Sequence, residues 1–278
     1  GILGGGVGTA NYLIKEGAIL TVTDLKTKKD LRNSISRIKS PRQSSGQAKK
    51  VTYRLGSHKK NDFRQADIVV FNQSVPHNSP WVKFARKIQK PIESDLTIFS
   101  HEARKNKSEY VGITGTRGKT TTSHWLSHFL PEATMGGNMP EKGLSYLAMQ
   151  GSRTSRIPRS PTSKGPLYAL ELSSFQLEYS KSDTLPPKIA VITNLYIDHV
   201  NYHGTLKKYF AAKFKLFVNQ TKKDYLILNR DNKYTSLILK QNPKSKIYYF
   251  SLSPLSRKVD GIFADVDQVV FQKNGRRI

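Results

Sequence analysis

The stretch YVGITGTRGKT, residues 110–120, indicates a β-strand that runs directly into a glycine-containing loop. The β-branched run at its start is typical of a buried strand, and residues 121–130 read as a helix. A loop between a strand and a helix N-terminus is the setting in which backbone N–H groups and the helix dipole hold a phosphate. The stretch therefore predicts an α/β fold with a phosphate-binding loop.

This loop also carries the side chains that nucleotide binding needs. Lys119 can reach the outer phosphates, and the Thr120 hydroxyl can ligate Mg²⁺. The eight-residue Walker pattern requires glycine where this chain has Ile113, so only the shorter form G-x-x-G-K-T stands here. An ordinary glycine turn is the alternative, but the Gly-Lys-Thr ending in this context favours nucleotide binding. The predicted nucleotide-binding residues of the loop are Gly115, Thr116, Arg117, Gly118, Lys119, Thr120 and Thr121.

The composition narrows the class of protein. The 278 residues leave room for about two domains, and the absence of cysteine excludes disulfides and thiolate metal sites. The absence of cysteine fits a cytoplasmic protein, and we also expect a monomer. No apolar run approaches the ~20 residues that cross a bilayer, so we expect no membrane insertion. The net charge of +26 attracts nucleic acid non-specifically, but the basic residues are scattered over the chain. RNA binding therefore stays a minority alternative.

The first segment, residues 1–107, predicts a Rossmann-like domain of alternating strands and helices. Residues 1–8 read as the end of a strand and a glycine turn, residues 9–17 and 80–90 as helices, and residues 19–24 and 67–71 as strands. The turn at Gly4–Thr9 resembles G-x-G-x-x-G with Thr9 in place of the third glycine, and Asp24 stands where a ribose-contacting acid is expected. These features suit a nucleotide diphosphate site or a plain βα turn.

The second segment, residues 108–278, predicts another α/β unit after a linker at 105–108. Its expected strands are residues 110–114, 167–172, 188–194, 225–229 and 247–250, followed by a β-rich tail at 262–271. Ligands of an open parallel sheet bind at the carboxyl ends of the strands, where Glu171, Asp198 and His199 stand. A carboxylate and an Asp-His pair beside the phosphate loop predict Mg²⁺-assisted phosphoryl transfer. Taken singly, Glu171 could cap a helix and His199 could be a loop residue.

Lys213 falls on the apolar stripe of an expected helix at residues 205–219. A desolvated lysine becomes a neutral amine, which can react with CO₂ to give a carbamate that acts as a metal ligand. The alternative is a lysine whose ammonium group reaches solvent at the edge of the stripe. The pattern alone favours that alternative.

Five motifs occur in the order typical of the Mur ligase family, which the chain resembles from residue 1 almost to its end. They are GTRGKTT at 115–121, Gly136-Gly137-Asn138, ELSSFQLE at 171–178, Asn194 with Asp198-His199, and Ala211-Ala212-Lys213. The ELSSFQLE string is most similar to the member that adds D-glutamate to UDP-N-acetylmuramoyl-L-alanine. The resemblance implies an ATP-dependent acid–amino-acid ligase of peptidoglycan synthesis that works through an acyl phosphate, with a UDP-binding domain at 1–107 and an ATP-binding central domain at 108–278.

The resemblance also implies roles for individual residues. Lys119, His199 and Lys213 would be catalytic, and two Mg²⁺ ions would be held by Thr120, Glu171, His199 and Lys213, the last as a carbamate. The adenine side would meet Asn229 and Asp231. The UDP-sugar would be bound by Gly6, Val7, Gly8, Thr9, Asp24, Ser74, Asn138, Ser173 and Gln176.

Some positions depart from the family pattern. Thr9 replaces a glycine, Asn72-Gln73-Ser74 replaces Ser-Pro-Gly, and residues 229–232 read Asn-Arg-Asp-Asn instead of Asn-Ala-Asp-Asp. We also expect that the true N-terminus and a C-terminal domain are absent, which would leave the piece weakly active. The alternatives are a sister Mur or folylpolyglutamate-type ligase, a non-catalytic basic nucleotide- or RNA-binding protein, and an NAD oxidoreductase that rests on the glycine turn alone.

Overall fold

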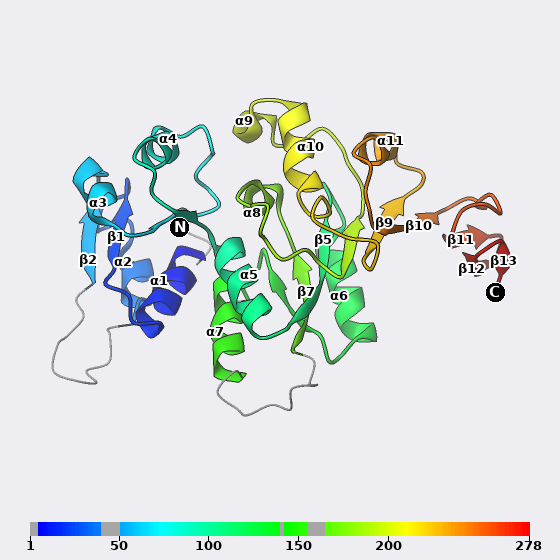
Figure 1. Ribbon diagram of the computed structural model, residues 1–278, viewed down its shortest axis with the longest axis horizontal. Helices are drawn as coiled ribbons and strands as arrows, with labels where there is room; N and C mark the ends of the chain where they lie inside the picture. Colours follow the sequence, from blue (N-terminus) through cyan, green and yellow to red (C-terminus); the bar gives the residue numbers. More distant parts are fainter. Residues whose placement is uncertain (1–4, 40–50, 140–141, 155–164) are drawn as a thin grey trace.

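The computed structural model describes residues 5–39, 51–139, 142–154 and 165–278, and its architecture is α/β, as predicted. Figure 1 shows the N-terminal elements, coloured blue to cyan, beside a large sheet whose last strands, coloured orange to red, lie at the far end. Among the described residues, no helix has both the length and the apolar character that crossing a membrane requires.

A nine-stranded sheet dominates the described part of the chain, in the order β13-β12-β11-β10-β9-β8-β5-β7-β6. Neighbouring strands from β6 to β11 run parallel, whereas the pairs β11–β12 and β12–β13 are antiparallel. The strands are β5 (Glu109–Thr114), β6 (Thr134–Gly137), β7 (Leu167–Glu171), β8 (Ile189–Ile192), β9 (Tyr225–Asn229), β10 (Lys246–Ser251), β11 (Gly261–Asp265), β12 (Gln268–Lys273) and β13 (Arg276–Arg277). The chain passes from β5 to one side of the sheet and returns to the other side at β8, so a ligand-binding crevice is expected between these two strands.

Helices connect the parallel strands, as βα units require. They are α5 (Asp95–Lys105), α6 (Lys119–Phe129), α7 (Leu144–Thr154), α8 (Ser174–Glu178), α9 (Val200–His203), α10 (Leu206–Phe214) and α11 (Thr235–Leu239). The helix expected over residues 205–219 ends at Phe214, and residues 215–219 form turns instead. Helix α5 was not predicted from the sequence, although Ser94 and Thr97 form a capping box at its start.

The N-terminal part differs in detail from the single sheet that was predicted. In the described residues its strands form two separate parallel pairs, β1 (Thr21–Asp24) with β2 (Thr52–Leu55) and β3 (Val69–Val70) with β4 (Ile92–Glu93). The remaining helices are α1 (Gly5–Lys15), α2 (Arg32–Ser36), α3 (Lys60–Gln65) and α4 (Pro80–Lys87). The strand end expected at residues 1–3 lies outside the described residues.

The glycine run was wrongly read as a turn up to Gly8. Helix α1 begins at Gly5, so Gly5, Gly6 and Gly8 are helical residues. Glycine lowers helix stability by ~1 kcal/mol relative to alanine, but the apolar face of α1 compensates. Tyr12 of this face packs with Ile98 of α5 and Ala148 of α7. Packing against two other helices thus extends α1 toward the N-terminus, which local propensity did not predict.

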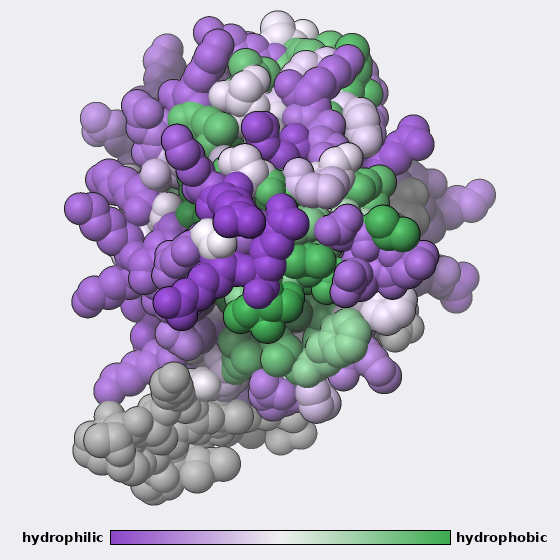
Figure 2. Space-filling model, turned by 90° about the vertical axis from the view of Figure 1, so that its right-hand side faces the viewer, coloured by the Kyte–Doolittle hydropathy of each residue, from purple (hydrophilic) through white to green (hydrophobic). Residues whose placement is uncertain are grey.

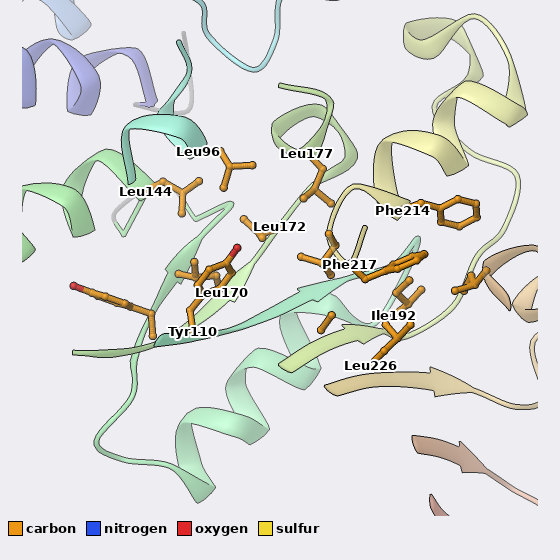
Figure 3. Close-up of a cluster of buried hydrophobic side chains, with 14 of the residues drawn as sticks. Leu96, Tyr110, Leu144, Leu170, Leu172, Leu177, Ile192, Phe214, Phe217 and Leu226 are labelled. Carbon is orange, nitrogen blue, oxygen red and sulfur yellow. The ribbon is translucent and has the colours of Figure 1, made fainter. Parts of the chain in front are cut away.

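The main hydrophobic core lies between the sheet and the helices on one of its faces (Figure 3). Leu170 of β7, Ile192 of β8 and Leu226 of β9 are almost fully buried in it. Phe214 and Leu177 pack onto these strands from α10 and α8. Continuous apolar runs in the strands are expected because a parallel sheet is covered on both faces.

The surface is mostly hydrophilic, as the charge predicts. Figure 2 shows the side of the molecule on which the last strands lie, with an apolar area between the hydrophilic side chains. The exposed apolar residues of these strands and their turns are Ile262, Val266, Val269, Phe271 and Ile278.

Replacing Leu170 with alanine tests the position of the core. Because Leu170 is fully buried, Leu170→Ala should lower the free energy of unfolding by about 2–5 kcal/mol. Urea denaturation followed by circular dichroism measures the change. Val269→Ala is the control, since its side chain is 71% exposed and should change stability by less than about 0.5 kcal/mol. Equal effects for both variants would contradict this description of the core.

Candidate functional site

The loop between β5 and α6 has a backbone that only glycine permits at two points. Gly118 has φ +80°, and a side chain at Gly115 would place its Cβ 1.9 Å from Thr193 Oγ1. The loop is held from the end of β8, because Thr116 N donates to Asn194 O at 3.0 Å and Arg117 N donates to Asn194 Oδ1 at 2.9 Å. The loop is therefore fixed at the β5–β8 crevice, at the N-terminus of α6.

Lys119, the candidate phosphate-binding residue, and Thr120, the candidate metal ligand, both make hydrogen bonds at the loop. Lys119 Nζ donates to Gly115 O at 3.1 Å and to Thr116 O at 3.2 Å, so the lysine arches over the loop. Thr120 Oγ1 donates to Glu171 Oε2 at 2.7 Å. Glu171 ends β7 and is buried. A hydroxyl and a carboxylate oxygen side by side are hard ligands that suit Mg²⁺.

Lys213 is buried, so the solvent-reaching alternative that the pattern alone favoured is wrong. Its side chain is 2% exposed, Nζ donates to Gly115 O at 2.8 Å, and the ring of Tyr209 lies 4.9 Å from Nζ. Burial, with the nearby charge of Lys119, lowers the pKa of Lys213 from 10.5 to about 7, against an opposing effect of Asp198. A large fraction of the side chain is thus an uncharged, nucleophilic amine near neutral pH.

His199 stands beside this cluster at a strained backbone position. It precedes α9 with φ +49°, and its ring packs 4.9 Å from that of Phe175 and 5.8 Å from that of Tyr209. Partial burial, with the charges of Lys213 and Lys119, lowers its pKa, although the carboxylate of Asp198 acts in the opposite direction. The His199 side chain is 43% exposed, so it faces the solvent side of the crevice.

The structure thus gathers Lys119, Thr120, Glu171, His199 and Lys213 around one loop. Among the described residues there is no group of three or more His, Cys, Asp or Glu side chains that could hold a metal ion. Any metal here would depend on the Thr120–Glu171 pair together with His199 or a modified Lys213. Sequence analysis did not single out Tyr209, whose hydroxyl lies 3.1 Å from Thr116 Oγ1.

The two expected adenine-side residues are engaged in local contacts. Asn229 Nδ2 donates to Thr193 O at 3.1 Å, directly behind the phosphate loop. The carboxylate of Asp231 accepts from Ser251 Oγ and from Leu252 N, both at 2.7 Å. In this structure Asp231 fixes the turn after β9 to the end of β10.

A cavity of about 510 Å³ lies where α1, α7 and the ends of β6 and α5 meet. Val7, Gly8 and Asn138 of the predicted UDP-sugar set line it, and Asn138 N donates to Glu171 O at 2.7 Å. Glu171 therefore touches the cavity wall through its carbonyl and the phosphate loop through its carboxylate. Gly137 permits this approach, because a Cβ there would lie 2.1 Å from Glu171 O.

Other residues of the predicted UDP-sugar set do not line the cavity. Thr9 Oγ1 lies 2.8 Å from Ser145 Oγ, Asp24 accepts from Lys26 N, and Ser74 donates to Asn72. Gly6 is a partly exposed residue of α1.

Ser173 and Gln176 stand behind the cavity wall instead. They form the capping box of α8, in which Ser173 Oγ accepts from Gln176 N. Ser173 Oγ also donates to Gln73 Oε1 at 3.1 Å, and Gln176 Nε2 donates to Asp95 Oδ2 at 3.2 Å. Gln73 and Asp95 line the cavity. The hydrogen bonds from Ser173 and Gln176 therefore orient two side chains of the cavity wall.

Several lining residues were missed by sequence analysis. They are Asn11, Arg37, Lys39, Gln73, Asp95, Ser145 and Tyr146. Arg37 and Lys39 belong to a Ser/Arg/Lys-rich stretch that reads as a loop, and residues 40–50 of that stretch lie outside the described residues. Only the high local charge could have indicated an anion-binding role.

Comparison with known proteins places this geometry in a family. The model of the Mur ligase middle domain matches residues 113–276. The chain is 34% identical over 279 residues to the UDP-N-acetylmuramoylalanine–D-glutamate ligase of Borreliella afzelii, covering 99% of this chain and 55% of that protein. It is 33% identical over 288 residues to the enzyme of the same name from a Roseiflexus species, covering 100% of this chain and 57% of that protein. The chain thus spans about half the length of the curated relatives it matches.

The fold agrees with a solved structure. The crystal structure of UDP-N-acetylmuramate:L-alanyl-γ-D-glutamyl-meso-diaminopimelate ligase from Neisseria meningitides superposes with a TM-score of 0.55 at 15% identity, over 97% of this chain and 81% of that one. At this identity the likeness concerns the fold alone. The match of the middle-domain model covers more than half of the chain and includes the phosphate loop, Glu171, His199 and Lys213. The chain belongs to the Mur ligase family.

Proposed function

We propose that this chain serves an ATP-dependent ligase that joins D-glutamate to UDP-N-acetylmuramoyl-L-alanine in peptidoglycan synthesis. The observation that carries the proposal is the position of Glu171. Its carboxylate meets Thr120 of the phosphate loop, and its carbonyl accepts from Asn138 in the cavity wall. A nucleotide on the loop and a sugar nucleotide in the cavity would therefore meet at one residue. The names of the relatives support D-glutamate as the amino acid.

The proposed reaction has two steps, and the described residues would position the groups of the first. The alanyl carboxylate attacks the γ-phosphorus of ATP, so an acyl phosphate forms and ADP leaves. The amine of D-glutamate then attacks the acyl carbon, loses a proton and expels inorganic phosphate. Lys119 and the loop N–H groups hold the phosphates, while the cavity holds the sugar nucleotide so that its carboxylate reaches them.

The residues present fit Mg²⁺, which would supply charge neutralisation on the phosphates. Thr120 and Glu171 would hold one ion, and His199 with Lys213 would support a second. For that role the neutral Lys213 amine would attack CO₂, form an N–C bond and release a proton, giving a carbamate. The buried position and depressed pKa of Lys213 support this modification. ATP and UDP-sugars are cytoplasmic metabolites, so the reaction belongs in the cytoplasm.

Phosphate release tests the function directly. In the full-length protein, release should require ATP, UDP-N-acetylmuramoyl-L-alanine and D-glutamate together, and Lys119→Ala should reduce it by at least about 100-fold because a phosphate-binding charge is lost. Lys222→Ala, at an exposed position, is the control and should behave like wild type. Release that ignores D-glutamate, or an active Lys119→Ala variant, would refute the proposal.

Chemical rescue tests the carbamate. Lys213→Ala should lose most activity, and short carboxylates such as acetate or formate should restore part of it by entering the vacated space as metal ligands. Steady-state phosphate release at increasing carboxylate concentration measures the rescue, with Lys222→Ala as the unaffected reference. Wild-type rates in Lys213→Ala, or a complete lack of rescue, would argue against a carbamate.

The dependence of stability on pH tests the buried amine. Lys213 keeps its ordinary pKa of 10.5 when unfolded and has a pKa of about 7 when folded, so below pH 7 its burial costs on the order of 5 kcal/mol. Between pH 7 and 10.5 the unfolded chain binds more protons, so wild-type stability rises with pH and the penalty disappears.

The Lys213→Met variant should therefore be more stable than wild type near pH 6, and the difference should shrink toward pH 10. Thermal melts in CO₂-free buffer, which keep the amine unmodified, measure it. A difference that does not change with pH would show that Lys213 titrates normally.

A further inference from the structure

Hydroxyl groups of α8 and α9 hold the loop that follows β3. Tyr202 Oη, on α9, donates to Gln73 O at 2.8 Å and to Val75 O at 3.1 Å. Tyr179 Oη, at the end of α8, donates to Val75 O at 2.6 Å. Two tyrosines from the second segment thus fix the backbone of one short loop from the first segment.

The held loop forms part of the cavity wall. Gln73 lines the cavity, and its side-chain oxygen accepts from Ser173 Oγ at 3.1 Å. Its backbone and side chain are therefore both anchored to the second segment. A shift of Tyr202 would move Gln73 relative to a ligand in the cavity.

The other end of the same short helix lies near the phosphate loop through Tyr209. The ring of His199 lies 5.8 Å from that of Tyr209, whose hydroxyl lies 3.1 Å from Thr116 Oγ1 of the loop. Helix α9 begins directly after His199. His199 therefore precedes Tyr202 by three residues. The ring of Phe175 lies between these two side chains, with centroid distances of 4.4 Å to Tyr202 and 4.9 Å to His199. His203 Nε2 lies 3.0 Å from Ser174 Oγ, which ties α9 to α8. We expect a helix of one turn that is packed this closely to shift as a unit.

The surroundings keep the Tyr202 hydroxyl a hydrogen-bond donor. Burial, reinforced by the negative charge of Glu178, raises the pKa of Tyr202. The phenol therefore stays protonated at neutral pH and keeps its one hydrogen for donation.

We propose that Tyr202 is a positioning residue that couples binding of the sugar nucleotide in the cavity to the placement of His199 at the phosphate loop. The inference rests on the proposed function for the identity of the two ligands. Its physical content is that one short turn, His199–His203, holds Gln73 of the cavity wall through Tyr202 and carries His199, which packs on Tyr209 beside the phosphate loop. Sugar nucleotide binding that fixes Gln73 would fix α9 and His199, so each ligand should tighten the other by the same factor.

Binding linkage measures this coupling. Isothermal titration calorimetry of the full-length protein gives the dissociation constant of UDP-N-acetylmuramoyl-L-alanine with and without Mg²⁺ and a non-hydrolysable ATP analogue. In wild type the analogue should tighten sugar-nucleotide binding at least about 5-fold. Tyr202→Phe removes only the hydroxyl, and should bring this factor to within about 2-fold of unity.

Two further variants separate coupling from general stability. Tyr179→Phe loses a hydrogen bond to the same Val75 carbonyl but does not lie on α9, so its coupling factor should equal that of wild type. Phe175→Leu keeps the Tyr202 hydroxyl but removes the ring between Tyr202 and His199, so it should lose coupling as well. Circular dichroism shows whether Tyr202→Phe folds. If it does not fold, Phe175→Leu tests the coupling in its place.

The outcomes are distinct. Wild-type protein that binds neither ligand would refute the proposed function itself. Wild type that binds both without mutual tightening, or a Tyr202→Phe variant with the full wild-type factor, would overturn the inference and leave the proposed function standing. Loss of coupling in Tyr202→Phe and Phe175→Leu, with Tyr179→Phe unchanged, supports it.

Discussion

The carbonyl oxygen of Gly115 is the point on which the candidate site depends. It accepts from Lys213 Nζ at 2.8 Å and from Lys119 Nζ at 3.1 Å. Burial, and after it the charge of the neighbouring Lys119, lowers the pKa of Lys213. Lys119 is the more exposed of the two lysines. Gly115 has no side chain, so its backbone can lie directly beside Thr193. In that position the loop lies between two lysines that differ in burial.

The stretch from Glu171 to Tyr179 joins this loop to the cavity. Glu171 contacts Thr120 with its carboxylate and Asn138 with its carbonyl, and the cap of α8 holds the lining residues Gln73 and Asp95. The side chains of Ser173 and Gln176 act here through other residues of the wall. That arrangement explains why a sequence motif with several polar residues contributes few atoms to the cavity surface itself. Its hydrogen bonds position the wall, and the packing of Phe175 extends the connection to His199.

Local sequence predicted well those features that depend on near neighbours. The strand, loop and helix at residues 109–129, the strand ending at Glu171 and the buried stripe carrying Lys213 follow from hydrophobic period and glycine placement. Prediction failed where distant packing decided the outcome. Helix α1 extends to Gly5 because α5 and α7 support its apolar face, and the helix at Lys213 ends at Phe214 because the chain must turn back toward β9. The separate pairs β1–β2 and β3–β4 likewise depend on strand pairing across many residues.

By itself, the sequence determined the chemistry that is available: a glycine loop ending in Lys119 and Thr120, a carboxylate at the end of a strand, and a lysine on an apolar stripe. Each of these follows from residues adjacent in the chain, where backbone geometry and side-chain period are local properties. Only the tertiary structure decided which of these groups meet, since that depends on strand order and on the crossing between β5 and β8. The same applies to the cavity, whose walls come from α1, α7 and the ends of α5 and β6. A surface assembled from segments far apart in the chain has no periodic signature, because its residues are close in space but are not regularly spaced in the sequence.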